Sequence, residues 1–580
     1  MYKPDALYER GDDGAIGYSS TDDEIDTGHR SVHTIDYTSD SSRSSEASSV
    51  LQNVRKRVRP ISSSDDSDVA DDEWNWTEDE NIVNIKEFTE TPGINPLVLR
   101  TLGADSTPLC VLKQILSDDF FEMIVRETNR YADQMNMEHT TKMSKDWFPV
   151  TNDEIRAYFA LCIIMSQVKK SKLEMYWSKR RIIETPVFSE IMPYKRFLSI
   201  THYLHFVNNE TMSKKDRIRK IRPVVEYLNT KFQQLYVPEE DVVIDESLMK
   251  FRGRLNYVQF IASKRARFGI KFYKLCESTS GYCSRFKIYT GQDKIEGTDI
   301  PVSQSIVMEL AEPILGEGYT LFLDNWYSSP ELFKILNRNN TNVIGTVRKN
   351  RKNMPKKLTS YKLKRGDVTT LSCKGILCLR WRDKKDVYIM SSKHSRAEMV
   401  TTGKIRRKKG GEQENVIKPS CVIEYNRGMG GVDRQDQFLA SFPLMRKSIK
   451  GYKKMFFYMF DIAVYNAYVL YSKLPNRTKQ SMVNFRLNIA EDMLYNLSLP
   501  DYPARGRPSQ SECPTRLQAK HWAHFPEHIS STEKKKLPTK RCRVCAKNNI
   551  RSETTWQCKK CLVPLHVPKC FEIFHTVQNY

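Results

Sequence analysis

The spacing of apolar residues changes at residue 241, and this change limits the folds that the chain can adopt. Before it, residues 94–240 have helical spacing, for example in CVLKQILSDDFFEMIVRETNRYADQM (110–135). TNDEIRAYFALCIIMSQV (151–168) begins with Thr151 followed three residues later by Glu154, a capping-box pattern. The sequence therefore predicts an all-helical region that is followed by a different kind of structure.

Between residues 241 and 347, strand-like runs alternate with helical ones. Three early strands, a helix and then a strand–helix–strand unit predict a mixed sheet with helices on its faces, an α/β fold. ESTSGY (277–282) is typical of a hairpin turn. The strand candidates are VVIDE (242–246), FGIKFYKLC (268–276), SRFKIYT (284–290), YTLFLD (319–324) and NVIGTV (342–347), and the helix candidates are 300–315 and 329–339.

The rest of the body is less clearly patterned. Residues 348–419 are rich in Lys and Arg and contain one strand candidate, VYIMSS (387–392), and a predicted basic loop, GKIRRKKGG (403–411). Helical character returns at 432–473. The run MFFYMFDIAVYNAYVLY (455–471) contains Asp461 and Asn466, which favours a buried helix over a membrane span.

Charge is distributed unevenly along the 580 residues. Residues 1–90 contain 22 Asp and Glu but 9 Lys and Arg, a net charge of −13. Since the whole chain has a net charge of +22, the remaining residues carry a net charge of +35. The acidic segment is poor in aliphatic residues and is predicted to be disordered, with a candidate nuclear-import signal in VRKRVRP (54–60). A basic body of this size favours nucleic acid as partner and the nucleus as location.

Three carboxylates lie at predicted element boundaries. Asp245 ends the first strand and Asp324 the fourth, and Asp433 follows Gly430-Gly431 at the start of a helix, with Asp436 one turn further on. If the two strands are neighbours, their acids lie side by side at one edge of the sheet. Grouped carboxylates repel one another, and a divalent cation such as Mg²⁺ relieves that cost and supports phosphoryl transfer.

At these residues the chain resembles the piggyBac-family transposases. The resemblance rests on VVIDESLMKFRGR, FIASKRARFGIKFY, LFLDNWYSS and YNRGMGGVDRQDQ, and it extends from about residue 94 to the C-terminus. It implies an RNase H-like catalytic core with a DDD triad at Asp245, Asp324 and Asp433, two Mg²⁺ ions, and Asp436 as a further candidate ligand. It also implies a homodimer that acts on double-stranded DNA by cut and paste, with hairpin intermediates and insertion at TTAA.

Composition and the resemblance together predict a division into domains. Residues 1–93 would be a disordered acidic tail. Residues 94–240 and 443–505 would form a split helical dimerisation and DNA-binding domain. The catalytic domain would take 241–350 and 420–442, interrupted by an insertion domain at 351–419. A linker would follow at 506–535, then a zinc-binding domain at 536–580.

The C-terminal tail carries the spacing of a zinc site. Cys542 and Cys545 form one CxxC pair and Cys558 and Cys561 a second, and His566, Cys570 and His575 follow. These seven donors are one short of two tetrahedral sites. The sequence therefore leaves two alternatives open, a single zinc ion, or two ions with an eighth ligand from a nearby histidine such as His524.

Several basic residues are candidates for contacts with DNA. Arg505 and Arg507 flank a glycine in a pattern like that of a minor-groove AT-hook, and an ordinary linker is the alternative. The others lie near the acids in sequence, where a solvated rim is the alternative reading: Arg252, Arg254, Lys264, Arg265 and Arg267.

Three functions fit these patterns. The first is a DNA transposase, and the second is a domesticated, non-catalytic DNA- or chromatin-binding protein derived from one. The third is a ubiquitin ligase built on a RING-like tail, which leaves the basic body unexplained.

Overall fold

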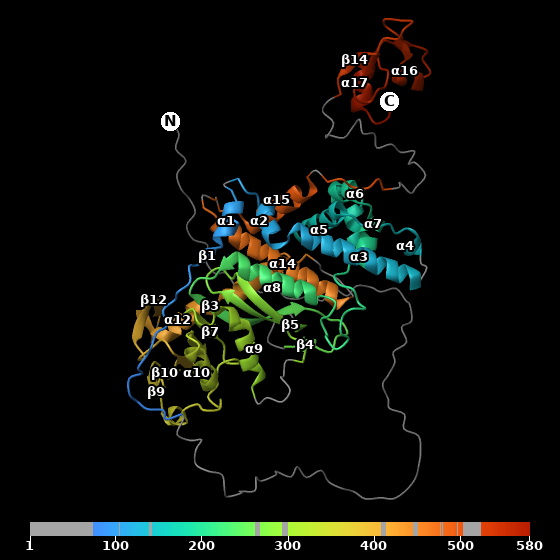
Figure 1. Ribbon diagram of the computed structural model, residues 1–580. Helices are drawn as coiled ribbons and strands as arrows, with labels where there is room; N and C mark the ends of the chain where they lie inside the picture. Colours follow the sequence, from blue (N-terminus) through green and yellow to red (C-terminus); the bar gives the residue numbers. More distant parts are fainter. Residues whose placement is uncertain are drawn as a thin grey trace, which may run out of the picture. The chain divides into compact units, whose positions relative to one another are not determined.

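The computed structural model describes residues 74–580 apart from 104, 139–141, 262–266, 293–299, 408–412, 445–449, 476, 478, 496 and 503–523. The described residues form a body (residues 74–502) and a zinc module (residues 524–580) (Figure 1). VRKRVRP, Lys264, Arg265, Arg505 and Arg507 lie outside the described residues.

The first part of the body is helical, as predicted. One short exception is β1 (Gly93–Ile94), which pairs with β2 (Tyr236–Val237). The helices are α1 (Pro96–Thr101), α2 (Pro108–Ile115), α3 (Asp118–Glu138), α4 (Lys142–Lys145), α5 (Asn152–Gln167), α6 (Pro186–Ile191), α7 (Tyr194–Tyr203) and α8 (Arg222–Leu235), with 3-10 turns η1 (Leu173–Trp177) and η2 (Arg181–Ile183).

Two helical predictions need correction. The pattern over 110–135 is divided between α2 and α3, because the backbone of Ser117 donates to the Tyr227 hydroxyl and accepts from Phe120 instead of continuing one helix. Thr151 does cap α5 by accepting from the Glu154 amide at 3.2 Å. The Glu154 carboxylate, however, is fully buried against the guanidinium of Arg196 at 2.7 Å, so only half of the capping box forms.

A nine-stranded sheet forms the centre of the body (Figure 1). Its order is β4-β5-β3-β7-β8-β11-β10-β9, and β6 pairs with β5. The β3–β7 and β7–β8 pairs are parallel, and the remaining pairs are antiparallel. The strands are β3 (Asp241–Lys250), β4 (Gln259–Phe260), β5 (Phe268–Glu277), β6 (Cys283–Ile288), β7 (Thr320–Leu323), β8 (Asn342–Thr346), β9 (Val368–Cys373), β10 (Ile376–Arg382) and β11 (Asp386–Ser391).

Each face of the sheet is covered by its own apolar core. Side chains of β3 alternate, so that Val243 and Met249 join the core shared with the helical region, while Val242 and Ile244 join the opposite core. The first face is covered by α8, α13 (Gly431–Ser441) and α14 (Gly451–Lys473), and the second by α9 (Val302–Ala311), η3 (Glu312–Ile314) and α10 (Pro330–Arg338).

The segment 348–419 is more regular than its sequence indicated. Strands β9, β10 and β11 extend the central sheet, and α11 (Lys357–Ser360), β12 (Met399–Arg407) and β13 (Gln413–Pro419) also lie in it. The predicted basic loop therefore begins as a strand. The pattern concealed β10 because Arg380 is buried within it and donates to the carbonyls of Leu358 and Tyr361. Apart from the assignments of residues 74–92 and 526–528, the domain boundaries stay a prediction.

Residues 74–92 were predicted to be disordered, and this is wrong. Trp74, Trp76 and Phe88 pack against the core on the α9–α10 face. Thr77 forms a β-bridge to Ser372 on the edge strand β9. The acidic composition did not show these contacts because only three aromatic residues of the segment pack against this core.

The last body helices are buried, as expected for 455–471. α12 (Ser420–Gly428) leads into α13, and α14 and α15 (Met482–Leu494) pack among the helices of the first part. Asp461 in α14 is neutralised by the Arg486 guanidinium at 2.8 Å. In the described ranges, no helix has the length and hydropathy needed to span a bilayer.

The zinc module is built from short elements around a small core of its own. They are β14 (Pro526–His528), β15 (Lys540–Arg541), α16 (Arg543–Lys547), β16 (Glu553–Thr554), β17 (Trp556–Cys558) and α17 (Lys569–Thr576). Because β14 pairs with β17, residues 526–528 belong to this module and not to the predicted linker.

Candidate active site and zinc centres

Strands β3 and β7 bring two of the predicted acids together. Ile244 and Leu323 are register partners in the parallel pair, so Asp245 and Asp324 follow at adjacent positions. β7 ends there, as predicted, but β3 continues through Lys250 because it stays paired with β5 as far as Gly269. Asp245 is therefore inside a strand rather than at its end, which fixes its backbone on both sides.

Negative charge is concentrated around these two residues. Burial raises the pKa of Asp245 to about 8, and the charges of Glu246 and Asp324 add to the effect. Burial and the Glu246 charge also raise the pKa of Asp324, against the opposing influence of the Trp326 amide, Arg348 and Lys271. A bound cation would stabilise the ionised form of both carboxylates.

The third predicted acid comes from α13. This helix packs on β3 and β5, and Gly431 permits the approach: a Cβ at that position would lie 2.5 Å from the Glu277 carbonyl oxygen and 2.8 Å from Val243 Cγ1. The close backbone approach expected of the glycine pair is thus confirmed for Gly431. Asp433 is exposed in the first turn of α13. Asp436, one turn later, accepts a 2.6 Å hydrogen bond from Ser247 Oγ on β3.

The site also contains residues that the sequence did not single out. The Tyr425 hydroxyl lies 3.2 Å from Thr346 Oγ1, and burial together with the Asp324 and Asp245 charges raises its pKa to about 12. Lys274, the register partner of Asp245, is completely buried. A lysine inside the apolar run FGIKFYKLC was the available signal for it.

Aromatic and basic side chains border the acids. Trp326 stacks on Tyr273 with ring centroids 5.9 Å apart, and the Lys271 ammonium lies 4.6 Å from the Trp326 ring. Arg351 donates to the backbone carbonyls of Asn325 and Trp326 and holds the turn after Asp324. Arg252, Arg254 and Arg267 are exposed, which is consistent with either contact to DNA or a solvated rim.

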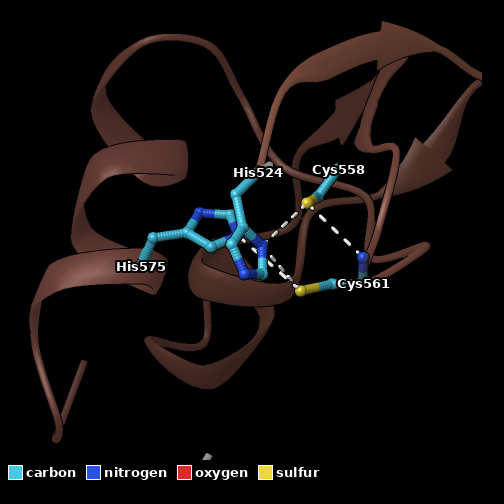
Figure 2. Close-up of side chains that lie close together, drawn as sticks. All are labelled: His524, Cys558, Cys561 and His575. Atoms are coloured by element: carbon cyan, nitrogen blue, oxygen red, sulfur yellow. Dashed lines mark hydrogen bonds between the residues drawn. The ribbon is translucent and has the colours of Figure 1, made fainter. Parts of the chain in front are cut away.

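The zinc module gathers its donors into two groups of four. Cys542, Cys545, His566 and Cys570 form the first, and His524, Cys558, Cys561 and His575 the second, with the donor atoms of each group within 4.8 Å of one another. Figure 2 shows the two imidazoles of the second group facing the two sulfurs. His524 thus supplies the eighth donor that the sequence left open.

The spacing of the donors fits tetrahedral zinc. Zn–S bonds of about 2.3 Å and Zn–N bonds of about 2.0 Å place neighbouring donors roughly 3.3–3.8 Å apart. His524 Nδ1 lies 3.3 Å from Cys558 Sγ and 3.2 Å from Cys561 Sγ. In the other group, His566 Nδ1 lies 3.5 Å from Cys545 Sγ and 3.7 Å from Cys570 Sγ.

Backbone carbonyls orient the histidine donors, and backbone amides lower the pKa of a cysteine donor. His575 Nδ1 lies 2.7 Å from the Phe571 carbonyl, which orients Nε2 toward the cysteines. His566 Nε2 lies 3.1 Å from the Glu553 carbonyl and leaves Nδ1 to the cluster. Burial alone would raise the pKa of Cys542, but backbone amides of Cys545, His566 and Val544 lower it to about 7, which favours the thiolate.

Comparison with known proteins decides the family. Residues 107–468, more than half of the chain, match the family described as Transposase IS4. The chain belongs to this transposase family. Residues 523–576 match the DDE_Tnp_1-like zinc finger, which contains all eight donors. The module is therefore a zinc finger of transposase type, and the predicted zinc is supported.

This transposase is also similar to piggyBac-derived proteins. It is 27% identical to the human PiggyBac transposable element-derived protein 3 over 481 residues, 81% of this chain and 76% of the relative. It is 26% identical to the human PiggyBac transposable element-derived protein 2, over 73% of this chain and 71% of the relative. The predicted piggyBac resemblance is confirmed.

A solved structure shows the same fold. The piggyBac transposase in a synaptic complex with hairpin DNA superposes with a TM-score of 0.61 at 21% identity, and the alignment covers 83% of this transposase and all of that chain. This likeness confirms the predicted fold class, a mixed-sheet core with helices and a C-terminal Cys-rich module.

Proposed function

We propose that this transposase is catalytically active and moves DNA by cut and paste, with Asp245, Asp324 and Asp433 holding two Mg²⁺ ions. The observation that carries the proposal is the β3–β7 register, which puts Asp245 and Asp324 next to each other with raised pKa values. A structural role would not require two half-buried acids to meet.

The donor set fits the metal. Mg²⁺ takes oxygen ligands and is usually bound through one or two carboxylates together with substrate phosphate. When bound, Mg²⁺ lowers the cost of charge on the attacking and leaving oxygens of an in-line phosphoryl transfer. Asp245 is held rigidly inside a strand, and Asp324 is fixed by the Trp326 amide, so both carboxylates are oriented in advance.

The surrounding residues can position the DNA. Lys271, Arg348 and Arg351 border the acids and can contact phosphates on either side of the scissile bond. Trp326 is only half-buried and can stack on an unpaired base. Arg252, Arg254 and Arg267, together with the basic residues of the zinc module, extend the contact with the double helix and make binding depend on salt.

The finer details of the reaction belong to the same proposal. We propose TTAA targets, hairpin intermediates, a homodimer and action in the nucleus. The likeness to a piggyBac transposase that was solved with hairpin DNA supports the hairpin step, and the other three are expectations from the resemblance. The candidate import signals are VRKRVRP (54–60) and GKIRRKKGG (403–411), and EKKKLPTKR (533–541) is a third.

A second function is favoured by the relatives themselves. The human relatives are named as derived from transposable elements. In a domesticated descendant the zinc module and the basic body would bind DNA or chromatin, and the carboxylates would have no catalytic role.

A cellular excision assay separates the two functions. The reporter carries the TTAA-bounded DNA that flanks this chain's own coding sequence, and it is tested with the wild type and with Asp245→Asn. Seamless excision by the wild type alone supports the active transposase. Specific binding of the flanks without excision supports the domesticated protein.

A further inference from the structure

Lys274 on β5 is buried without any exposed side-chain surface, and it lies beside the proposed metal site. It is the register partner of Asp245 across the β3–β5 pair, so both side chains lie on the sheet face that α13 covers. A buried ammonium is costly unless its donors are matched. The protein must therefore gain something specific from keeping a lysine here.

Three acceptors surround the ammonium. Lys274 Nζ donates to Gln435 Oε1 at 2.7 Å, to the Tyr458 hydroxyl at 2.9 Å and to Asp436 Oδ1 at 3.0 Å. Burial opposes the positive charge, but Asp436 and Tyr458 raise the pKa of Lys274 overall. Two of the three acceptors are neighbours on α13, so this one side chain fixes both the height and the rotation of that helix on the sheet.

The hydrogen bonds to Asp436 are all made to one of its carboxylate oxygens, Oδ1. Its Oδ1 accepts from Ser247 Oγ at 2.6 Å and Lys274 Nζ at 3.0 Å, and the Tyr458 hydroxyl lies 3.4 Å away. A carboxylate oxygen with two short hydrogen bonds from neighbouring strands is well suited to anchor a helix. Asp433, one turn earlier and exposed, has the freedom to bind a metal.

We propose that Lys274 is a positioning residue, which anchors α13 through Asp436 and thereby sets where the helix presents Asp433 relative to Asp245. Asp436 is the anchor and not a metal ligand. This inference rests on the proposed metal site at Asp245, Asp324 and Asp433, and it assigns different tasks to two aspartates three residues apart.

The test measures Mn²⁺ affinity in the full-length, zinc-loaded protein from the electron paramagnetic resonance signal of free Mn²⁺. Tyr458→Phe is the main variant, because it removes one hydroxyl from the network while leaving the buried charges paired. Tyr465→Phe is the matched control: it lies on the same helix, but its hydroxyl binds the Ser280 carbonyl. Lys274→Met is the stronger variant, with thermal unfolding measured alongside.

The expected result is a graded loss of affinity. Tyr458→Phe and Lys274→Met weaken Mn²⁺ binding about tenfold or more, as changes beside metal ligands do, while Tyr465→Phe has no effect. Asp436→Asn has the same effect as Tyr458→Phe, and combining the two adds little because both act through one network. Asp433→Asn removes the binding.

Two results would overturn the inference. One is unchanged Mn²⁺ affinity in Tyr458→Phe and Lys274→Met proteins that unfold at the wild-type temperature. The other is loss of binding in Asp436→Asn with retention in Asp433→Asn, which would make Asp436 the ligand. A wild-type protein that binds Mn²⁺ at Asp245 but cleaves no DNA contradicts the proposed function. The role of Lys274 is then still decided by the Mn²⁺ affinities of the variants.

Discussion

Asp245 and Asp324 are 79 positions apart in the chain, yet they follow directly after Ile244 and Leu323, which are register partners in two parallel strands. The relationship requires α9 to cross between β6 and β7 on one face of the sheet, so that β7 returns beside β3. It places two acidic side chains where neither can be ionised at low cost without a cation.

The packing of α13 on the sheet depends on Gly431. Gly431→Ala would place a methyl group 2.5 Å from the Glu277 carbonyl oxygen, a backbone atom that cannot move aside easily. We expect a loss of about 1–3 kcal/mol in the free energy of unfolding and a larger proportional loss of Mn²⁺ affinity. Denaturant unfolding and metal titration measure the two effects. Gly430→Ala is the control, because the space around Gly430 is open, and an equal effect in both variants would contradict this account of the packing.

The zinc module should bind two zinc ions per chain. Cys561→Ser removes a donor from the group that contains His524 and should leave one ion, whereas Cys110→Ser, on the exposed surface of α2, should leave both. Zinc released by acid or chelator can be counted with a colorimetric indicator. Since the module has only a small core, chelation should also unfold it. A wild-type content of one zinc would show that one of the two donor groups is not a metal site.

Lys453 gives the stability of the body a defined dependence on pH. Burial, together with the charges of Lys450 and Lys220, lowers its pKa to about 7, and its ammonium faces the carbonyls of Thr201 and His202. Between pH 7 and about 10.4, the usual lysine value, the unfolded chain binds the proton and the folded one does not.

The free energy of unfolding should therefore rise with pH across this window, by up to about 1.4 kcal/mol per unit from this residue. In Lys453→Met the rise should be smaller by that amount. Chemical denaturation at pH 7, 8 and 9 compares the two proteins. Parallel profiles for the wild type and the variant would mean that Lys453 keeps an ordinary pKa.

The sequence predicted the parts of the site that depend on local pattern. The strands that lead to Asp245 and Asp324 follow from short apolar runs with acids after them, and the close backbone approach beside Asp433 follows from the glycines before it. CxxC spacing predicted four of the five cysteines in the two donor groups. In each of these cases, residues close together in the chain determine the structure.

What the sequence missed depends on contacts between distant residues. Lys274 binds Asp436, 162 positions away, and nothing near Lys274 in the chain shows that partner. For His524 the sequence indicated only a candidate ligand, because its nearest cysteine partner lies 34 positions further along the chain. Arg380 made β10 look irregular because its carbonyl partners lie in a separate segment. Residues 74–92 pack against a sheet edge and a core whose residues lie far away in the chain.

The central claim is that Asp245 and Asp324 form one metal-dependent active site, and strand nicking tests it most directly. A labelled duplex that carries an end of the element and its TTAA flank is incubated with the purified wild type, Asp324→Asn or the exposed surface control Asp119→Asn, with and without Mg²⁺. We predict Mg²⁺-dependent nicking by the wild type and by Asp119→Asn. Asp324→Asn should bind the duplex but cleave it at least 1,000-fold more slowly, a loss of roughly 4 kcal/mol in transition-state stabilisation. Nicking by Asp324→Asn at the wild-type rate would contradict the account.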